Sequence, residues 1–106
     1  MFTLQSLPEE VKIIVFDQKN AEINNSIAVF HKLKSEQLGK VLQILVSVIT
    51  KEIPVKEFPA RVKKIGLTGV DVDKLVLDFA ILRLLPLRDW LEDVDTLVTK
   101  LKKNQK

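Results

Sequence analysis

Apolar residues recur at helical spacing along the last third of the chain, and a proline stands among them. The pattern begins at Val72, continues by steps of three and four residues through Pro86 and ends at Leu101. Such a stripe predicts one face of an amphipathic helix, whereas a strand would show strict alternation. Because Leu85 is a poor N-cap, we expect one long helix that is kinked at Pro86, with a tight corner between two helices as the alternative.

Shorter amphipathic helices are predicted ahead of this one. The spacing Ser6-x-x-Glu9 is that of a capping box, in which each side chain accepts a backbone N–H, and it predicts a helix over residues 7–16. After a turn, apolar residues at helical spacing predict a second helix over residues 21–32. A third helix follows Ser35, and because it is apolar on nearly every side we expect it at the centre of the fold.

Two prolines and a second capping box mark the remaining boundaries. Pro54 suits a first helical position, but Pro59 lies inside the same segment, so the fourth helix should have an irregular first turn or begin nearer Phe58. The spacing Thr68-x-x-Asp71 predicts that the last helix begins directly after this threonine. The expected fold class is therefore all-α, a compact bundle of about five helices. Its expected core residues are Leu38, Val41, Leu42, Leu45, Phe58, Val62, Leu75, Phe79 and Leu82.

Composition limits the chain to one helical domain with a basic end. Its 106 residues can build a single hydrophobic core, and the absence of cysteine is typical of a cytoplasmic protein. The longest uncharged run, residues 41–50, is about half of what a membrane-spanning helix requires, so no membrane insertion is expected. Four of the last seven residues are lysines, and the net charge of the whole chain is +3, so this segment supplies the entire excess of positive charge. We therefore expect a domain over residues 1–99 and a basic tail over residues 100–106.

No set of side chains has the spacing of a catalytic or metal site. His31 is the only histidine and is expected at the edge of the core. The segment IGLTGV lacks the Gly-Lys-Ser/Thr ending of a phosphate-binding loop. The acidic residues of the last third fit a helix N-terminus and solvated faces, and not a calcium loop. They are Asp71, Asp73, Asp78, Asp89, Glu92, Asp93 and Asp95. We therefore expect no enzyme activity, no cofactor and no bound metal.

Two groups of surface candidates remain. The first surrounds the only tryptophan and holds residue types common at protein interfaces, although a tryptophan on the apolar stripe also suits the core. Its members are Leu84, Leu87, Arg88, Trp90 and Leu91. The second is basic and suits the phosphates of a nucleic acid, although lysines near a helix C-terminus also complement the helix dipole. Its members are Arg61, Lys63, Lys64, Lys100, Lys102 and Lys103.

Four short motifs, taken in their order, resemble a known kind of domain. LPEEV opens the first helix, QLGKVLQIL lies in the third, IGLTGVDVDKL leads into the last, and LLPLRDWL surrounds Pro86. Together, residues 7–91 resemble a short helical domain common in uncharacterised proteins of candidate-phylum bacteria. No activity is attached to that group, so the resemblance implies a non-enzymatic accessory or interaction domain.

Apolar residues outnumber the positions of one stripe per helix. The surplus comprises Ile13, Ile14, Val15, Ile44, Val46, Ile81, Leu84, Leu87 and Leu91. A bundle of this size has little interior in which to cover them, and large exposed apolar patches mark interaction sites. We therefore predict a non-enzymatic protein–protein interaction or scaffold domain, and a homodimer through the last helix would cover part of the surplus. The alternative is a weak electrostatic nucleic-acid-binding domain that uses the basic tail.

Overall fold

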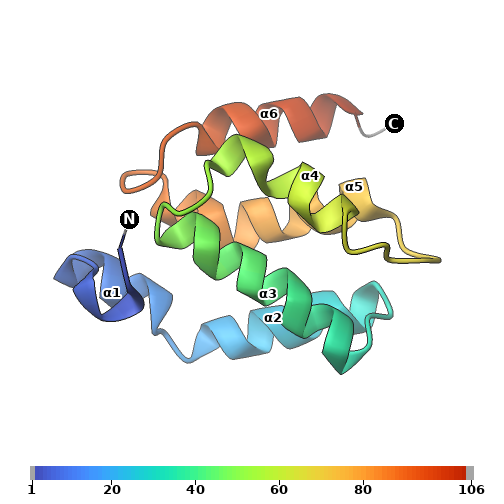
Figure 1. Cartoon of the computed structure of the whole chain (residues 1–106), viewed down its shortest axis with the longest axis horizontal. Coiled ribbons are helices and arrows are strands. Elements are labelled where there is room, and N and C mark those ends of the chain that lie inside the picture. The colour runs from blue at the N-terminus through green and yellow to red at the C-terminus, as the bar shows by residue number, and fades with distance from the viewer. Residues whose placement is uncertain (1, 105–106) are drawn as a thin grey trace.

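A computed structural model describes residues 2–104, which contain six α-helices and no strand (Figure 1). The all-α prediction is confirmed. The α-helices are α1 (Glu9–Val15), α2 (Lys19–Phe30), α3 (Ser35–Ile49), α4 (Phe58–Lys63), α5 (Val72–Phe79) and α6 (Val94–Asn104). Three 3-10 helices, η1 (Leu4–Ser6), η2 (Val55–Glu57) and η4 (Leu85–Leu87), and one π-helix, η3 (Ala80–Leu84), complete the elements. Within the described residues, none of the helices combines the length and the apolar character that crossing a membrane requires.

The two predicted capping boxes both differ from the observed caps. Ser6 pairs with Thr3, whose N–H donates to Ser6 Oγ at 2.8 Å, so this box closes η1 and not α1. Asp71 is itself the N-cap of α5, and its Oδ1 accepts the N–H of Lys74 at 3.1 Å. α5 therefore starts later than predicted, because Gly69 adopts a left-handed conformation, with φ of 71°, and cannot belong to the helix.

The predicted irregular start of the fourth helix is confirmed. η2 supplies one turn of 3-10 helix, and α4 then begins at Phe58 with Pro59 in its first turn. A proline is tolerated there because a first-turn N–H has no partner within the helix. Gly66, with φ of 80°, follows the helix in the left-handed conformation expected of a glycine after a helix end.

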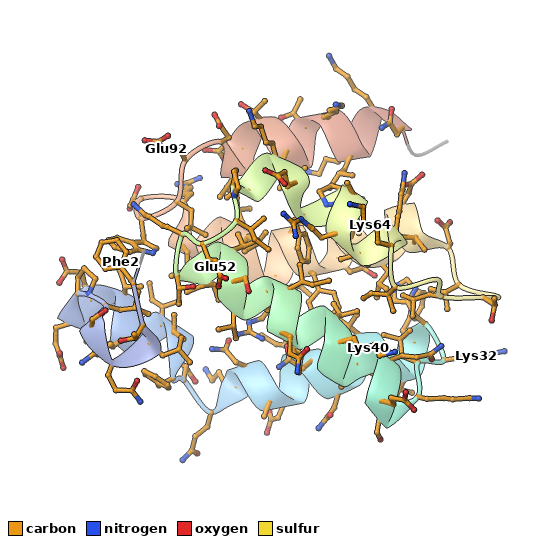
Figure 2. All side chains as sticks on the ribbon, viewed as in Figure 1. Phe2, Lys32, Lys40, Glu52, Lys64 and Glu92 are labelled. Atoms are coloured by element: carbon orange, nitrogen blue, oxygen red, sulfur yellow. The ribbon has the colours of Figure 1, made fainter. Side chains whose placement is uncertain are left out.

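The most enclosed helix is α5, whereas the third helix, which was predicted to be apolar on nearly every side, buries one face. Every residue from Val72 to Ile81 is buried or half-buried, and α5 packs against α2, α4 and α6. α3 buries one face and leaves Gly39, Lys40 and Gln43 in solvent; Lys40 is labelled on this face in Figure 2. Small and polar residues thus form the solvent-facing side of α3.

The π-helix η3 changes the phase of the last apolar stripe. In a π turn the hydrogen bond joins residues five apart, and here the N–H that follows η3 donates to the carbonyl of Ala80. The added residue turns Leu84 and Leu87 into the core and turns Leu82 and Pro86 outward. The predicted core position of Leu82 is therefore wrong, since this side chain is 44% exposed.

The last predicted helix is broken and not kinked. Pro86 lies in η4, and residues 88–93 form a turn. The last residue of this turn, Asp93, has a left-handed conformation with φ of 66°. α6 then runs back antiparallel to α5 and packs on it (Figure 1). The alternative of a corner between two helices is thus the observed one, and the corner follows Pro86.

Most of the predicted basic tail belongs to α6. The helix continues through Asn104, and Leu101 is only 4% exposed because it packs in the core one turn after Leu97. The boundary predicted at residue 99 therefore falls inside a helix, and residues 100–104 are part of the folded body. The remainder of the predicted tail, residues 105–106, lies outside the described residues.

The phase set by η3 predicts unequal costs for two neighbouring leucines. Leu84→Ala should lower the free energy of unfolding by about 2–5 kcal/mol, because it leaves a cavity in the core. Leu82→Ala should cost less than about 1 kcal/mol, because its side chain is largely in solvent. Urea unfolding followed by the fluorescence of the single tryptophan measures both losses. Equal losses, or a larger loss at Leu82, would contradict the observed phase.

Candidate functional site

A groove separates the corner between α1 and α2 from the η3–η4 segment. Its cavity has a volume of about 240 Å³. A second hollow of about 240 Å³ shares Ile14, Pro86 and Leu87 with the first and continues along α1 to Trp90. We name the two together the α1–η4 groove. The first hollow is lined by the apolar residues Ile13, Ile14, Val15, Ile23, Leu82, Pro86 and Leu87 and by the polar residues Asp17, Lys19, Asn20 and Arg83.

The large apolar side chains of Ile13, Ile14 and Leu82 remain exposed in this groove. Ile13 is 69% exposed, Ile14 is 38% exposed and Leu82 is 44% exposed. The side-chain amide of Asn20 donates to the carbonyls of Ile14 and Val15, each at 2.8 Å, and so ties the end of α1 to α2. The corner between the two helices therefore fixes the exposed isoleucines at the rim of the groove.

Arg83 lines the same groove although it is only 9% exposed. Its Nη1 donates to Oδ1 of Asn24 on α2. The ion pairs of the described residues include none with this guanidinium, so no described carboxylate lies within 4.0 Å of it. Burial lowers the pKa of Arg83 from its ordinary value, as expected of a desolvated cation. A buried arginine without a carboxylate is uncommon, and the sequence analysis missed it.

The residues of the predicted protein interface do not form one surface. Leu84, Leu87 and Leu91 are at most 4% exposed and belong to the core. Arg88 is exposed and Trp90 is half-buried. The phase change in η3 explains this result. It points Leu84 and Leu87 into the core, although the apolar stripe of a regular helix does not include them. Leu87 reaches the groove only as part of its base.

Trp90 closes the edge of the core and forms one end of the α1–η4 groove. Its Nε1–H donates to the carbonyl of Ile49 at 2.9 Å, and the Lys51 ammonium lies 4.0 Å from the centre of the ring. The ring of Phe2, labelled in Figure 2, meets it edge-on with 5.0 Å between centroids. The Phe2 N–H donates to the carbonyl of Thr50 at 2.9 Å. Trp90 thus anchors the start of the chain to the end of α3.

Part of the predicted basic group meets in a second concave site. Lys63 of α4 and Lys100 of α6 line a cleft of about 540 Å³ together with Lys56. Asp73 and Asp93 line the same cleft, and Lys63 pairs with Asp73 at 3.3 Å. The carboxylates offset much of the positive charge, which weakens any attraction for phosphates.

The other basic candidates lie outside this cleft. Arg61 of α4 pairs at 3.2 Å with Glu57, the last residue of η2. Lys103 lines a neighbouring hollow on α6, whereas the exposed Lys64 and Lys102 line neither site. Lys64 can be located in Figure 2. The predicted nucleic-acid contacts are therefore dispersed over α4 and α6.

His31 joins the end of α2 to α5. Its Nε2 lies 2.7 Å from Oδ2 of Asp78, whose Oδ1 accepts a hydrogen bond from Lys74 Nζ at 3.0 Å. His31 is buried, with an edge-on contact to the ring of Phe30. The prediction of a histidine at the core edge is confirmed, and the prediction that Asp78 is a solvated carboxylate is wrong. The two residues are 47 positions apart in sequence, and the spacing of residues within one helix cannot predict a contact over that distance.

Two concave sites are thus candidates, the α1–η4 groove and the cleft lined by Lys63 and Lys100. No protein-family model matches the chain, and neither a curated protein nor a solved structure does. What the chain binds must therefore be inferred from its own surface. The cleft has nearly balanced charges, whereas the groove combines exposed apolar side chains with a cation that lacks a carboxylate. The groove is the stronger candidate, because its apolar side chains are not covered by the described part of the chain and its buried arginine has no carboxylate partner there.

The environment of Arg83 predicts that this residue does not stabilise the fold. Arg83→Met keeps the length of the buried stem and removes the desolvated charge, so the free energy of unfolding should stay equal or rise by up to about 2 kcal/mol. Half-buried Asn24 can hydrogen-bond to water instead. Arg88→Met, at an exposed site, is the matched control and should change stability by less than about 0.5 kcal/mol. Urea unfolding tests both, and a clear loss in Arg83→Met would show that the cation supports the core.

Proposed function

We propose that the chain is a non-enzymatic protein–protein interaction domain whose partner docks in the α1–η4 groove. The observation that carries the proposal is the exposure of Ile13, Ile14 and Leu82 around a hollow that the fold leaves unfilled. Exposed apolar side chains around a concavity are typical of surfaces that a partner covers. The lack of cysteine supports the cytoplasm as the compartment.

The shape of the groove suits an amphipathic helix of the partner. Two hollows follow one another along α1, and apolar residues at successive turns of a bound helix would enter one after the other. Burial of each large apolar side chain contributes about 1.5–3 kcal/mol before the costs of association are subtracted. Pro86 at the rim has no N–H and a fixed φ, so it offers a rigid apolar contact.

Another exposed apolar pair supports the proposal less well. Val29 and Phe30 at the end of α2 are 78% and 71% exposed, but they do not line the groove. The ring of Phe30 already packs against His31. A pair of side chains outside the groove offers a partner less contact than a hollow with apolar walls, so we assign the docking role to the groove.

The proposed absence of catalysis is supported by the way the polar side chains are used. His31, the only histidine, is hydrogen-bonded to Asp78 and so joins the end of α2 to α5. Within the described residues, no three side chains of His, Asp or Glu gather as metal ligands would. The resemblance to a helical domain of candidate-phylum bacteria stays a prediction, and it implies the same kind of function.

The docking proposal predicts where a photo-crosslinking amino acid captures a partner. Placed at position 13 in cells that express the chain, it should yield a discrete cross-linked product, because this side chain borders the groove. The same amino acid at position 99, on the exposed side of α6, is the control and should yield none. Adding Leu82→Asp should remove the product at position 13.

Two outcomes of the cross-linking experiment would contradict the proposal, and a third would identify the partner as a second copy of the chain. A product at position 13 that survives Leu82→Asp would place the partner outside the groove and contradict the proposal. A product with twice the mass of the chain would identify a second copy as the occupant. Equal labelling at positions 13 and 99 would show random encounter and would also contradict it.

The alternative function is a weak electrostatic nucleic-acid-binding domain, and it is favoured by one observation. Lys56, Lys63 and Lys100 face one cleft. This function predicts that affinity for a short DNA duplex falls steeply with salt and is lost when Lys100, Lys102 and Lys103 are changed to Glu. Deletion of this segment is a poor test, because Leu101 lies in the core. Fluorescence anisotropy measures the affinity, and binding that ignores salt or survives the substitutions would reject the alternative.

A further inference from the structure

We propose that Arg83 selects the partner of the α1–η4 groove by binding one carboxylate of the partner segment, while apolar neighbours of that carboxylate pack on Ile13 and Leu82. This inference rests on the proposed function, because it requires a partner in the groove. It adds the chemical class of that partner, an amphipathic segment that carries an Asp or Glu among apolar residues.

Arg83 reaches the groove because of the π turn. It lies within η3, between Leu82, which points outward, and Leu84, which is fully buried. At this intermediate position the side chain extends between the core and the rim and meets Asn24 of α2. Irregular π turns of this kind are frequent at functional sites, because they give a side chain a direction that the α-helix does not offer.

The guanidinium has donors that the fold does not use. Arginine carries five N–H donors, and the structure shows one hydrogen bond, from Nη1 to Asn24. Within the described residues, no fully buried side-chain nitrogen lacks a partner, so the remaining nitrogens of Arg83 must reach solvent. Since Arg83 lines the first hollow, a group bound there would meet these donors.

The carboxylates near the groove do not take these donors. Asp17 lines the first hollow, but its Oδ1 accepts the N–H of Lys19 at 2.9 Å at the start of α2. Glu10 and Asp89 line the second hollow, and neither forms an ion pair with Arg83. The first hollow therefore holds two cations, Arg83 and Lys19, against a single carboxylate that already accepts a hydrogen bond.

The surroundings of Arg83 strengthen its attraction for a carboxylate. Burial, which lowers the pKa of this residue, places the charge where water screens it poorly, so an opposite charge gains more than it would on an open surface. The planar guanidinium can also bind both oxygens of a carboxylate at once. A free anion would use the charge alone, whereas a peptide segment would also bury apolar side chains against Ile13 and Leu82.

Peptide selection on the intact chain tests this inference. A phage library of random peptides is selected on the wild-type chain, and the strongest binder is synthesised with its acidic residue as Glu and as Gln. Affinities for the wild type and for Arg83→Met are measured by fluorescence anisotropy, with Arg83→Lys as a second variant that keeps the charge without the planar fork. Ile13→Asp tests whether the peptide lies in the groove.

Selected peptides are expected to share one Asp or Glu flanked by apolar residues. The Glu-to-Gln change in the peptide should weaken binding to the wild type by about tenfold or more and should have little effect with Arg83→Met, because the two changes remove the same contact. Arg83→Lys should retain part of the preference for Glu. Ile13→Asp should weaken both peptides.

The contrary outcomes separate this inference from the proposed function. Peptides that need Ile13 but show no preference for Glu, or whose Glu matters equally with Arg83→Met, would overturn the role of Arg83 and leave the groove as a docking site. Peptides that ignore Ile13→Asp would overturn both proposals. Failure to select any peptide would overturn the inference: self-association that Ile13→Asp abolishes would identify a second copy as the occupant, and a monomeric chain would leave the groove without a function.

Discussion

The hydrogen bond that defines η3, in which the N–H of Leu85 donates to the carbonyl of Ala80, determines much of the remaining structure. An α-helical bond would have kept Leu82 in phase with the residues of α5. The longer turn instead sends Leu84 into the core and leaves Leu82 in solvent. From this one change follow the packing of η4, the position of the corner that leads to α6, and the apolar rim of the groove beside α1.

Packing of other helices around α5 stabilises the π turn of η3. Every residue of α5 is buried or half-buried, and the helix contacts three other helices, so it holds the start of η3 in place. Beyond η4, α6 returns over α5 and buries Leu97 and Leu101 against the core. A π turn is wider than an α-helical turn, so the atoms within it pack less closely. The contacts with α5 and α6 compensate for that loss. The stable elements therefore surround the turn, and the exposed side chains of Ile13, Ile14 and Leu82 lie around the groove beside it.

Sequence periodicity predicts the parts of this fold that depend on local chemistry. The all-α class, the short fourth helix with its proline and the turn at Gly66 follow from caps and spacing. The phase of Leu82 does not, because a stripe drawn with 3.6 residues per turn assumes a regular helix. The contact of His31 with Asp78 and the burial of Arg83 depend on helices that meet far apart in sequence. One signal was present, an arginine enclosed by the leucines of ILRLL, and it marks the groove better than the tryptophan does.

The anchoring of Phe2 has a consequence for how this protein is handled and engineered. Phe2 packs on Trp90, and Trp90 forms the end of the groove, so a peptide joined ahead of Phe2 would start next to the proposed docking site. Tethering replaces diffusion with a high effective concentration, and even a weak ligand would then occupy the groove most of the time. A purification tag with acidic and apolar residues would act as such a ligand, whereas a tag placed after α6 begins at the opposite end of the bundle (Figure 1).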